Sequence, residues 1–265
     1  MTSFRVDQQD ALRWLARWPD SSVDMVMVDP AYASLDRHRR IGTTTRLTAG
    51  SGAMALKQAG EPDAGFFPTI PNAMYVPLAR EWRRVLRPHG CLVLFGDDFT
   101  QSHVAIPALS EVGFRPHGAG SKTYQREVIW DKRVIGMGYG TRRRHERIVV
   151  QQMPRPRPWR ANPDYDGSFS SVQAFKAVRG GFKTEKPVGL LRALIRQFSH
   201  AGDLVIDCFL GSGSAGEAAL RERRFFAGCD IVPATATSAH ARLSAFGSGD
   251  FVLPVRGGQL AMGLT

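Results

Sequence analysis

The sequence predicts a single α/β domain over residues 1–265, built as a doubly wound and mostly parallel sheet. Short apolar runs alternate with amphipathic helical stretches, which is the pattern of repeated βα units. Runs such as Val23–Val28 and Leu204–Ile206 are almost continuously apolar, as expected of parallel strands buried on both faces. A hydrophobic content of 43% supports a sizeable core, so no second domain is required.

The expected elements follow from periodicity and from their boundary residues. The expected helices are Ala11–Trp18, Asn72–Leu86 (stopping before Pro88), Ser102–Val112, Pro187–Phe198, Ala215–Arg223 and one more after Pro233. Pro187 stands at the favoured first position of its helix. The expected strands are Val23–Val28, Cys91–Phe95, Glu127–Trp130, Arg147–Val150, Leu204–Asp207, Phe225–Cys229 and a short final strand at Phe251–Val255.

Two long segments interrupt this alternation. Residues 33–71 are polar and glycine-rich, and residues 151–183 carry several prolines and arginines. Long irregular segments in a compact domain are usually functional loops. We therefore interpret both as candidate recognition insertions, with a mobile loop as the alternative for the second.

The charge balance favours a polyanionic partner. Lys and Arg number 35 against 24 Asp and Glu, a formal net charge of +11. Nucleic acid is the first candidate and a membrane surface the second, with a merely basic protein as the alternative. The three cysteines are too scattered for a disulfide framework or a zinc site. The N-terminus has no apolar signal core and no run reaches membrane-spanning length, so we expect a cytoplasmic protein without a bound metal.

A glycine-rich loop follows the strand at Leu204–Asp207. Gly211, Gly213 and Gly216 fit G-x-G-x-x-G, a pattern that lets the backbone approach a nucleoside cofactor. Asp230 ends the next strand, where an acidic group binds ribose hydroxyls. Asp207 would repel a pyrophosphate but attract a cationic sulfonium cofactor. A nicotinamide dinucleotide site and a purely structural turn are the alternatives.

An acidic, proline-containing and aromatic loop follows the strand at Val23–Val28. Asp29-Pro30-Ala31-Tyr32 offers a carboxylate, a backbone carbonyl and a flat ring. The two acceptors suit the two N–H groups of an exocyclic amine on a planar base, which could stack on the ring. An ordinary strand-to-loop turn is the alternative for these four residues taken alone.

Together these motifs resemble the amino-methyltransferases of DNA, which methylate adenine N6 or cytosine N4. Asp29–Tyr32 matches the family's Asp/Asn/Ser-Pro-Pro-aromatic motif except at Ala31, and Phe209, Gly211 and Gly213 match its Phe-x-Gly-x-Gly motif. Having the catalytic motif first is the circularly permuted order of the β group. Asp10 resembles the family's acidic position that contacts the cofactor adenine, and Asp230 resembles its ribose-binding acidic position. Thr184-Glu185-Lys186-Pro187 resembles the Gln-Lys-Pro segment beside the methionine part of the cofactor, and His145-Glu146 resembles a His-Glu motif near the target base.

The resemblance implies a Rossmann-like fold, S-adenosyl-L-methionine as cofactor and double-stranded DNA as substrate. The expected catalytic residues are Asp29, Pro30 and Tyr32. The expected cofactor-binding residues combine those of the resemblance with the glycine-rich loop and Asp207. They are Asp10, Lys186, Pro187, Asp207, Phe209, Gly211, Ser212, Gly213, Ser214 and Asp230. Family members with Asp at the first motif position mostly act on adenine, which favours adenine N6. Cytosine N4 and RNA stay open as targets, as do a homodimer and a cognate restriction endonuclease as partners, in a bacterial, phage or prophage setting.

Three basic clusters are candidate phosphate contacts. The first includes Arg37, Arg39, Arg40 and Arg46, the second Arg142, Arg143, Arg144 and the adjacent His145, and the third Arg155, Arg157 and Arg160. A solvated face is the alternative for each cluster. Trp159, Tyr165 and Phe169 could stack at the site or pack in the core. A nicotinamide-dependent oxidoreductase and an inactive DNA-binding module are the competing functions.

Overall fold

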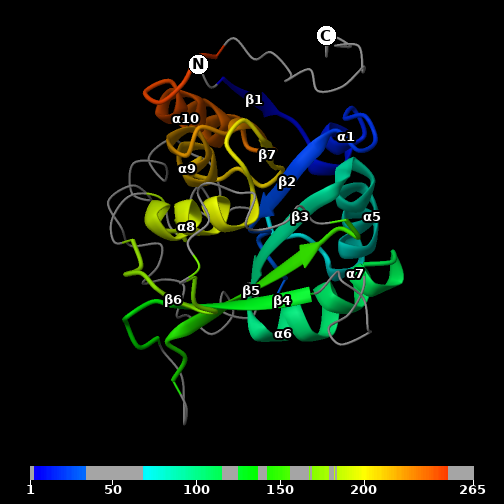
Figure 1. Cartoon of the computed structure of the whole chain (residues 1–265), viewed down its shortest axis with the longest axis vertical. Helices are drawn as coiled ribbons and strands as arrows, with labels where there is room; N and C mark the ends of the chain where they lie inside the picture. Colours follow the sequence, from blue (N-terminus) through cyan, green and yellow to red (C-terminus); the bar gives the residue numbers. More distant parts are fainter. Residues whose placement is uncertain are drawn as a thin grey trace, which may run out of the picture.

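The computed structural model describes residues 3–33, 68–114, 125–136, 142–155, 167, 169–178, 182 and 184–249. Its centre is an eight-stranded sheet in the order β1-β8-β7-β2-β3-β5-β4-β6 (Figure 1). The strands are β1 Phe4–Gln8, β2 Val23–Val28, β3 Leu86–Gly96, β4 Gln125–Asp131, β5 His145–Gln152, β6 Val172–Ala174, β7 Leu204–Asp207 and β8 Phe225–Asp230.

The sheet is mostly parallel, as predicted. Strands β1, β8, β7, β2 and β3 pair in parallel in that order, and β6 pairs in parallel with β4. Only β5 runs against its neighbours, β3 and β4. The carboxyl ends of β1, β8, β7 and β2 therefore lie along one edge of the sheet, which is where open α/β sheets place ligands.

Helices cover both faces of the sheet (Figure 1). On one face lie α1 Ala11–Leu15, η1 Asn72–Met74, α5 Tyr75–Val85, α6 Asp98–Thr100, η2 Gln101–Ala105 and α7 Ile106–Glu111. On the other lie α8 Val188–Phe198, α9 Ser214–Arg221 and α10 Pro233–Leu243. In β2, Val26 packs into the first layer and Met25 and Met27 into the second. Burial on both faces explains why this strand is apolar throughout.

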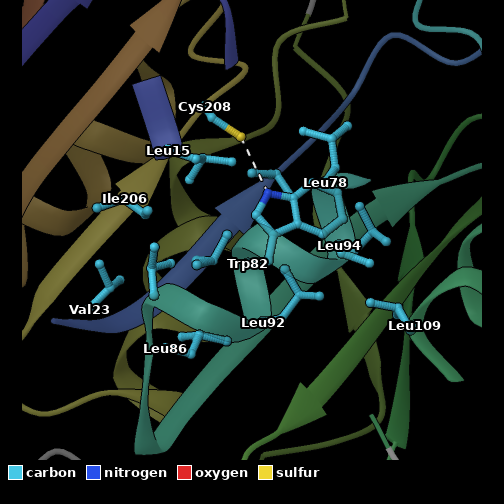
Figure 2. Close-up of a cluster of buried hydrophobic side chains, with 14 of the residues drawn as sticks. Leu15, Val23, Leu78, Trp82, Leu86, Leu92, Leu94, Leu109, Ile206 and Cys208 are labelled. Atoms are coloured by element: carbon cyan, nitrogen blue, oxygen red, sulfur yellow. Dashed lines mark hydrogen bonds between the residues drawn. The ribbon is translucent and has the colours of Figure 1, made fainter. Parts of the chain in front are cut away.

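The first of these layers anchors the loop that follows β7. Trp82 of α5 is fully buried among Leu15, Leu78 and Leu92 (Figure 2). Its indole Nε1 donates a hydrogen bond to the sulfur of Cys208 at 3.4 Å. Because Cys208 immediately follows Asp207, this core contact fixes the start of the glycine-rich loop.

The predicted elements within the described residues are present, but Leu86 begins β3 instead of ending a helix, and the helix predicted at Ser102–Val112 starts with the π-helical turn η2. Three further corrections concern Pro187, the N-terminus and the segment 151–183. Val188 is the first residue of α8, so Pro187 is its N-cap residue and not its first helical residue. The N-terminal β1 was not predicted, because only Phe4 of this edge strand is buried and charged residues interrupt its pattern. The segment 151–183 is not simply an irregular loop. It contains the short strand β6, and Phe169 packs edge-on against Phe198 of α8, in agreement with the core-packing alternative.

The final strand expected at Phe251–Val255 lies outside the described residues. In the part of the chain that the structure describes, no helix has the length and apolar composition needed to span a membrane.

Candidate active site

A cavity of about 580 Å³ lies at the carboxyl edge of the sheet. Four of the acidic residues that line it stand at or just after the ends of neighbouring parallel strands: Asp10 after β1, Asp230 of β8, Asp207 of β7 and Asp29 after β2. The parallel order of these strands brings together carboxylates that are far apart in the sequence. The two loops predicted to be functional therefore form the walls of one cavity.

The glycine-rich loop is shaped by two glycines with left-handed backbone. Gly211 has φ 50° and Gly213 has φ 77°, values that side chains with a Cβ adopt only at a cost. The Gly211 N–H donates to the Asp230 carboxylate at 3.0 Å, and the Phe209 N–H donates to Asp207 at 2.9 Å. A Cβ at Gly213 would lie 3.1 Å from that of Ala239, so the loop also packs closely on α10.

The two carboxylates that accept hydrogen bonds from the glycine-rich loop, Asp207 and Asp230, form no ion pair with a described cation. Asp207 is only 5% exposed, and burial raises the pKa of its carboxyl to about 8, with Asp29 and Asp230 adding repulsion. Burial also raises the pKa of Asp230, although the N–H groups of Val232 and Gly211 lower it in part. This half of the cavity therefore holds buried carboxyls that readily bind protons on their own and would ionise beside a cationic ligand.

The Asp29–Tyr32 loop is held in place by a segment that returns after residue 67. Ile70 donates its N–H to the Ala31 carbonyl at 2.7 Å, and Tyr32 forms a parallel bridge with Ile70. This pairing supports the turn although Ala31 replaces the second proline of the resembled motif. Pro30 is buried, and the side chains of Asp29 and Tyr32 line the cavity.

A chain of alternating charges surrounds Asp29. The Lys186 ammonium donates to Asp29 Oδ2 and lies 3.4 Å from Glu146 Oε1, and Glu146 Oε2 lies 2.9 Å from Lys132 Nζ. Burial opposes the lysine charge, but Asp29 and Glu146 raise the pKa of Lys186 to about 12. Burial also opposes the charge of Glu146, but Lys186 and Lys132 lower its pKa overall. Burial raises the pKa of Asp29, and Lys186 offsets part of that effect.

Most of the predicted catalytic and cofactor residues meet in this cavity. Its lining includes Asp10, Asp29, Pro30, Tyr32, Lys186, Asp207, Phe209, Gly211, Ser212, Ser214 and Asp230. Pro187 and Gly213 do not line it. Pro187 is instead the N-cap residue of α8, next to Lys186, and Gly213 turns the chain into α9.

The described members of the three predicted basic clusters do not line the cavity. Arg144 pairs with Asp131 at 2.6 Å, Arg143 with Asp98 at 3.2 Å, and Arg142 donates to the Gly136 carbonyl at 2.8 Å. His145 is exposed and 4.0 Å from Asp98. Arg155 lies beside Pro88, near the amino end of β3 and away from the carboxyl edge. Outside the described residues lie Arg37, Arg39, Arg40, Arg46, Arg157, Trp159, Arg160 and Tyr165.

Three charged residues of the cavity lining, Lys132, Glu146 and Glu185, were not among the predicted site residues, although Glu146 and Glu185 belong to motifs that carry the family resemblance. Glu146 follows His145 on β5, and because neighbouring side chains of a strand point to opposite faces, Glu146 is buried while His145 is exposed. Lys132 follows the end of β4, which runs parallel to β3 and so ends at the cavity edge. The alternation of side chains along a strand was the sequence signal that could have placed Glu146, and not His145, in the cavity.

The fold and site define a class: a doubly wound α/β methyltransferase with its catalytic loop ahead of its cofactor loop. The chain belongs to the N6/N4 DNA methylase family, whose model matches residues 23–240, and this family depends on S-adenosyl-L-methionine. It is 29% identical over 215 residues to the type II methyltransferase M.HhaII of Haemophilus parahaemolyticus, which covers 81% of this chain and 85% of that protein.

Solved structures show the same fold. TTHA0409 of Thermus thermophilus, in complex with S-adenosyl-L-methionine, has a TM-score of 0.64 at 22% identity over 96% of this chain and 95% of that one. The cytosine-N4-specific PvuII DNA methyltransferase has a TM-score of 0.61 at 16% identity, over 91% of this chain and 86% of that one. The chain is thus a DNA methyltransferase, and these likenesses leave the target base open.

Proposed function

We propose that this DNA methyltransferase methylates N6 of adenine within a short DNA site. The observation that carries the proposal is that Asp29 and Asp207, from the neighbouring strands β2 and β7, line one cavity. One carboxylate can receive an amine while the other faces a cationic cofactor. The choice of adenine rests on Asp29, since Asp at this motif position is typical of adenine enzymes in the resembled family.

The residues of the cavity fit S-adenosyl-L-methionine. A volume of about 580 Å³ is within the usual range for small-molecule sites, and the unpaired carboxylates suit a ligand with a positive centre. When bound, this cofactor supplies an electrophilic methyl group on a sulfonium. Asp230 and Gly211 would hold the ribose side, Asp10 the adenine side, and Asp207 the part nearest the positive centre.

The target base would reach Asp29 after leaving the DNA stack. Tyr32 would stack on its ring, and its amino group would donate to Asp29 and to the Pro30 carbonyl. Both acceptors draw the N–H protons and leave the nitrogen lone pair free to attack. As positive charge develops on that nitrogen, the carboxylate stabilises it without rearrangement, and fixed alignment supplies much of the remaining acceleration.

The test is methyl transfer to unmethylated genomic DNA from methyl-labelled cofactor, read by nucleoside mass spectrometry. We expect label in N6-methyladenine. Label in N4-methylcytosine would keep the mechanism and correct the base. Absence of label in either nucleoside, with cofactor bound, would overturn the proposal.

A further inference from the structure

Lys186 occupies the position on Asp29 that the target amino group requires. Its ammonium donates to Asp29 Oδ2, and its side chain is 9% exposed. The same ammonium lies 5.4 Å from the centre of the Phe95 ring, which forms another wall of the cavity. An N–H donor therefore already sits on the catalytic carboxylate in the protein without substrate.

A second anion stands beside this ammonium. Glu146 Oε1 lies 3.4 Å from Lys186 Nζ, while the other oxygen of Glu146 is held by Lys132 at 2.9 Å. Glu146 is buried, so its charge is poorly screened by water. A small displacement of the ammonium therefore exchanges one carboxylate for another, and the net charge of the cluster does not change.

The backbone around Lys186 is fixed, so such a displacement falls on the side chain alone. Thr184 has φ 68°, Pro187 caps α8, and Glu185 pairs with Arg242 at 2.9 Å. Lysine has a flexible four-carbon stem that can reorient its ammonium without moving the backbone.

Leaving the ammonium on Asp29 would oppose the reaction. The attacking nitrogen becomes positive during transfer, and a second positive charge on the same carboxylate repels it. That carboxylate would also be neutralised before the reaction needs it. Removal of Lys186 from Asp29 serves both binding and chemistry.

We propose that Lys186 stands in for the target amino group on Asp29 in the free protein and moves to Glu146 when the base enters. In this arrangement Glu146 is a positioning residue, because it receives the cation and does not touch the base. The inference rests on the proposed function, since it needs an amine substrate at Asp29.

The test compares Glu146→Gln with the double variant Glu146→Gln, Lys186→Met in DNA methylation kinetics. In Glu146→Gln the lysine keeps Asp29 as its only ion-pair partner among the described residues, so we expect kcat/KM for DNA to fall by roughly 10- to 100-fold, mainly through KM. Removing Lys186 as well frees Asp29. The double variant should regain about tenfold over the single one, since coupled neighbours behave non-additively.

Glu127→Gln on the neighbouring β4 is the matched control, because Glu127 pairs with Arg147 on the surface and lies outside the cavity lining. We expect wild-type kinetics from it, and thermal unfolding checks that every variant is folded. A double variant as slow as Glu146→Gln, or slower, would overturn the inference and make Lys186 a permanent counterion. An inactive wild-type protein would instead overturn the proposed function, and the inference with it, so the two failures are distinct.

Discussion

The two halves of the cavity handle charge in opposite ways. In the cofactor half, Asp207 and Asp230 have no ion pair to any described cation, and burial raises the pKa of both. In the target half, Asp29 and Glu146 are matched by Lys186 and Lys132. One half holds buried carboxyls without a cationic partner, and the other pairs each carboxylate with a lysine.

This difference matches the two ligands of the proposed reaction. A sulfonium cofactor brings its own positive charge, so a site that supplied a cation would exclude it. An exocyclic amine is neutral and competes for hydrogen bonds, so its site can hold a cation that an uncharged donor displaces. Without bound cofactor, the buried carboxyls of the cofactor half are expected to lower the free energy of unfolding. The target half is not expected to do so, because its charges are paired.

Asp29→Asn should have the largest effect on catalysis. The amide loses the negative charge that stabilises the developing positive charge, so we expect kcat to fall by roughly 10³-fold. The cofactor half is left intact, and cofactor Kd should stay within about threefold of wild type, which is under 1 kcal/mol. Single-turnover methylation and calorimetric titration of the cofactor measure the two quantities.

Asp20→Asn is the control for that substitution, because Asp20 is an exposed aspartate that pairs with Arg84 away from the cavity. It should leave both quantities unchanged. A loss of cofactor binding in Asp29→Asn with turnover intact would reverse the roles assigned to the two halves.

Asp207→Asn should produce the opposite pair of effects. Loss of a buried carboxylate facing a cation should weaken cofactor binding by roughly 10- to 100-fold, or about 1.4–2.7 kcal/mol. The same change removes an uncompensated buried charge, so the cofactor-free variant should melt higher than wild type at pH 9. Calorimetry and thermal unfolding check both. A variant that melts lower at pH 9 would contradict the view that this half is destabilising when empty.

The pH dependence of the cofactor half follows from Asp207. Its carboxyl has a pKa of about 8 in the folded protein, above the ordinary value of 3.8, so the folded state binds the proton more tightly. The contribution of Asp207 to stability is therefore present below pH 4 and is lost as pH rises toward 8. Cofactor binding requires the carboxylate, so affinity should increase up to about pH 8, with proton release below it.

Calorimetry in buffers of different ionisation enthalpy measures that proton release, and Asp207→Asn should abolish it. Equal proton release in the variant would assign the titration to another group.

Both loops could be predicted from the sequence because each directly follows an apolar strand, and the parallel order of β7 and β2 brings them together. The contact of Lys186 with the cofactor stays a prediction, and the hydrogen bond from its amino group to Asp29 was not predicted. The resemblance pointed to His145-Glu146 but not to which of the two side chains enters the cavity, and Lys132 was not selected, because both positions depend on the antiparallel pairing of β5 with β3 and β4. Local motifs thus predicted which strand ends meet at the cavity, whereas contacts across strands required the fold.

The smallest effect is expected outside both halves, at the exposed start of β5. Arg143 pairs with Asp98 at 3.2 Å and its side chain is more than half exposed, so the pair contributes little to stability and can yield to a DNA phosphate. Arg143→Gln should weaken DNA binding a few-fold for all sequences and reduce the slope of log K against log salt by about 1.

Fluorescence anisotropy over a salt series measures the slope. Arg196→Gln on α8 is the control, because Arg196 pairs with Glu222 away from the cavity lining. An unchanged slope would assign Arg143 to the solvated surface, and a loss restricted to one DNA sequence would instead indicate a base contact.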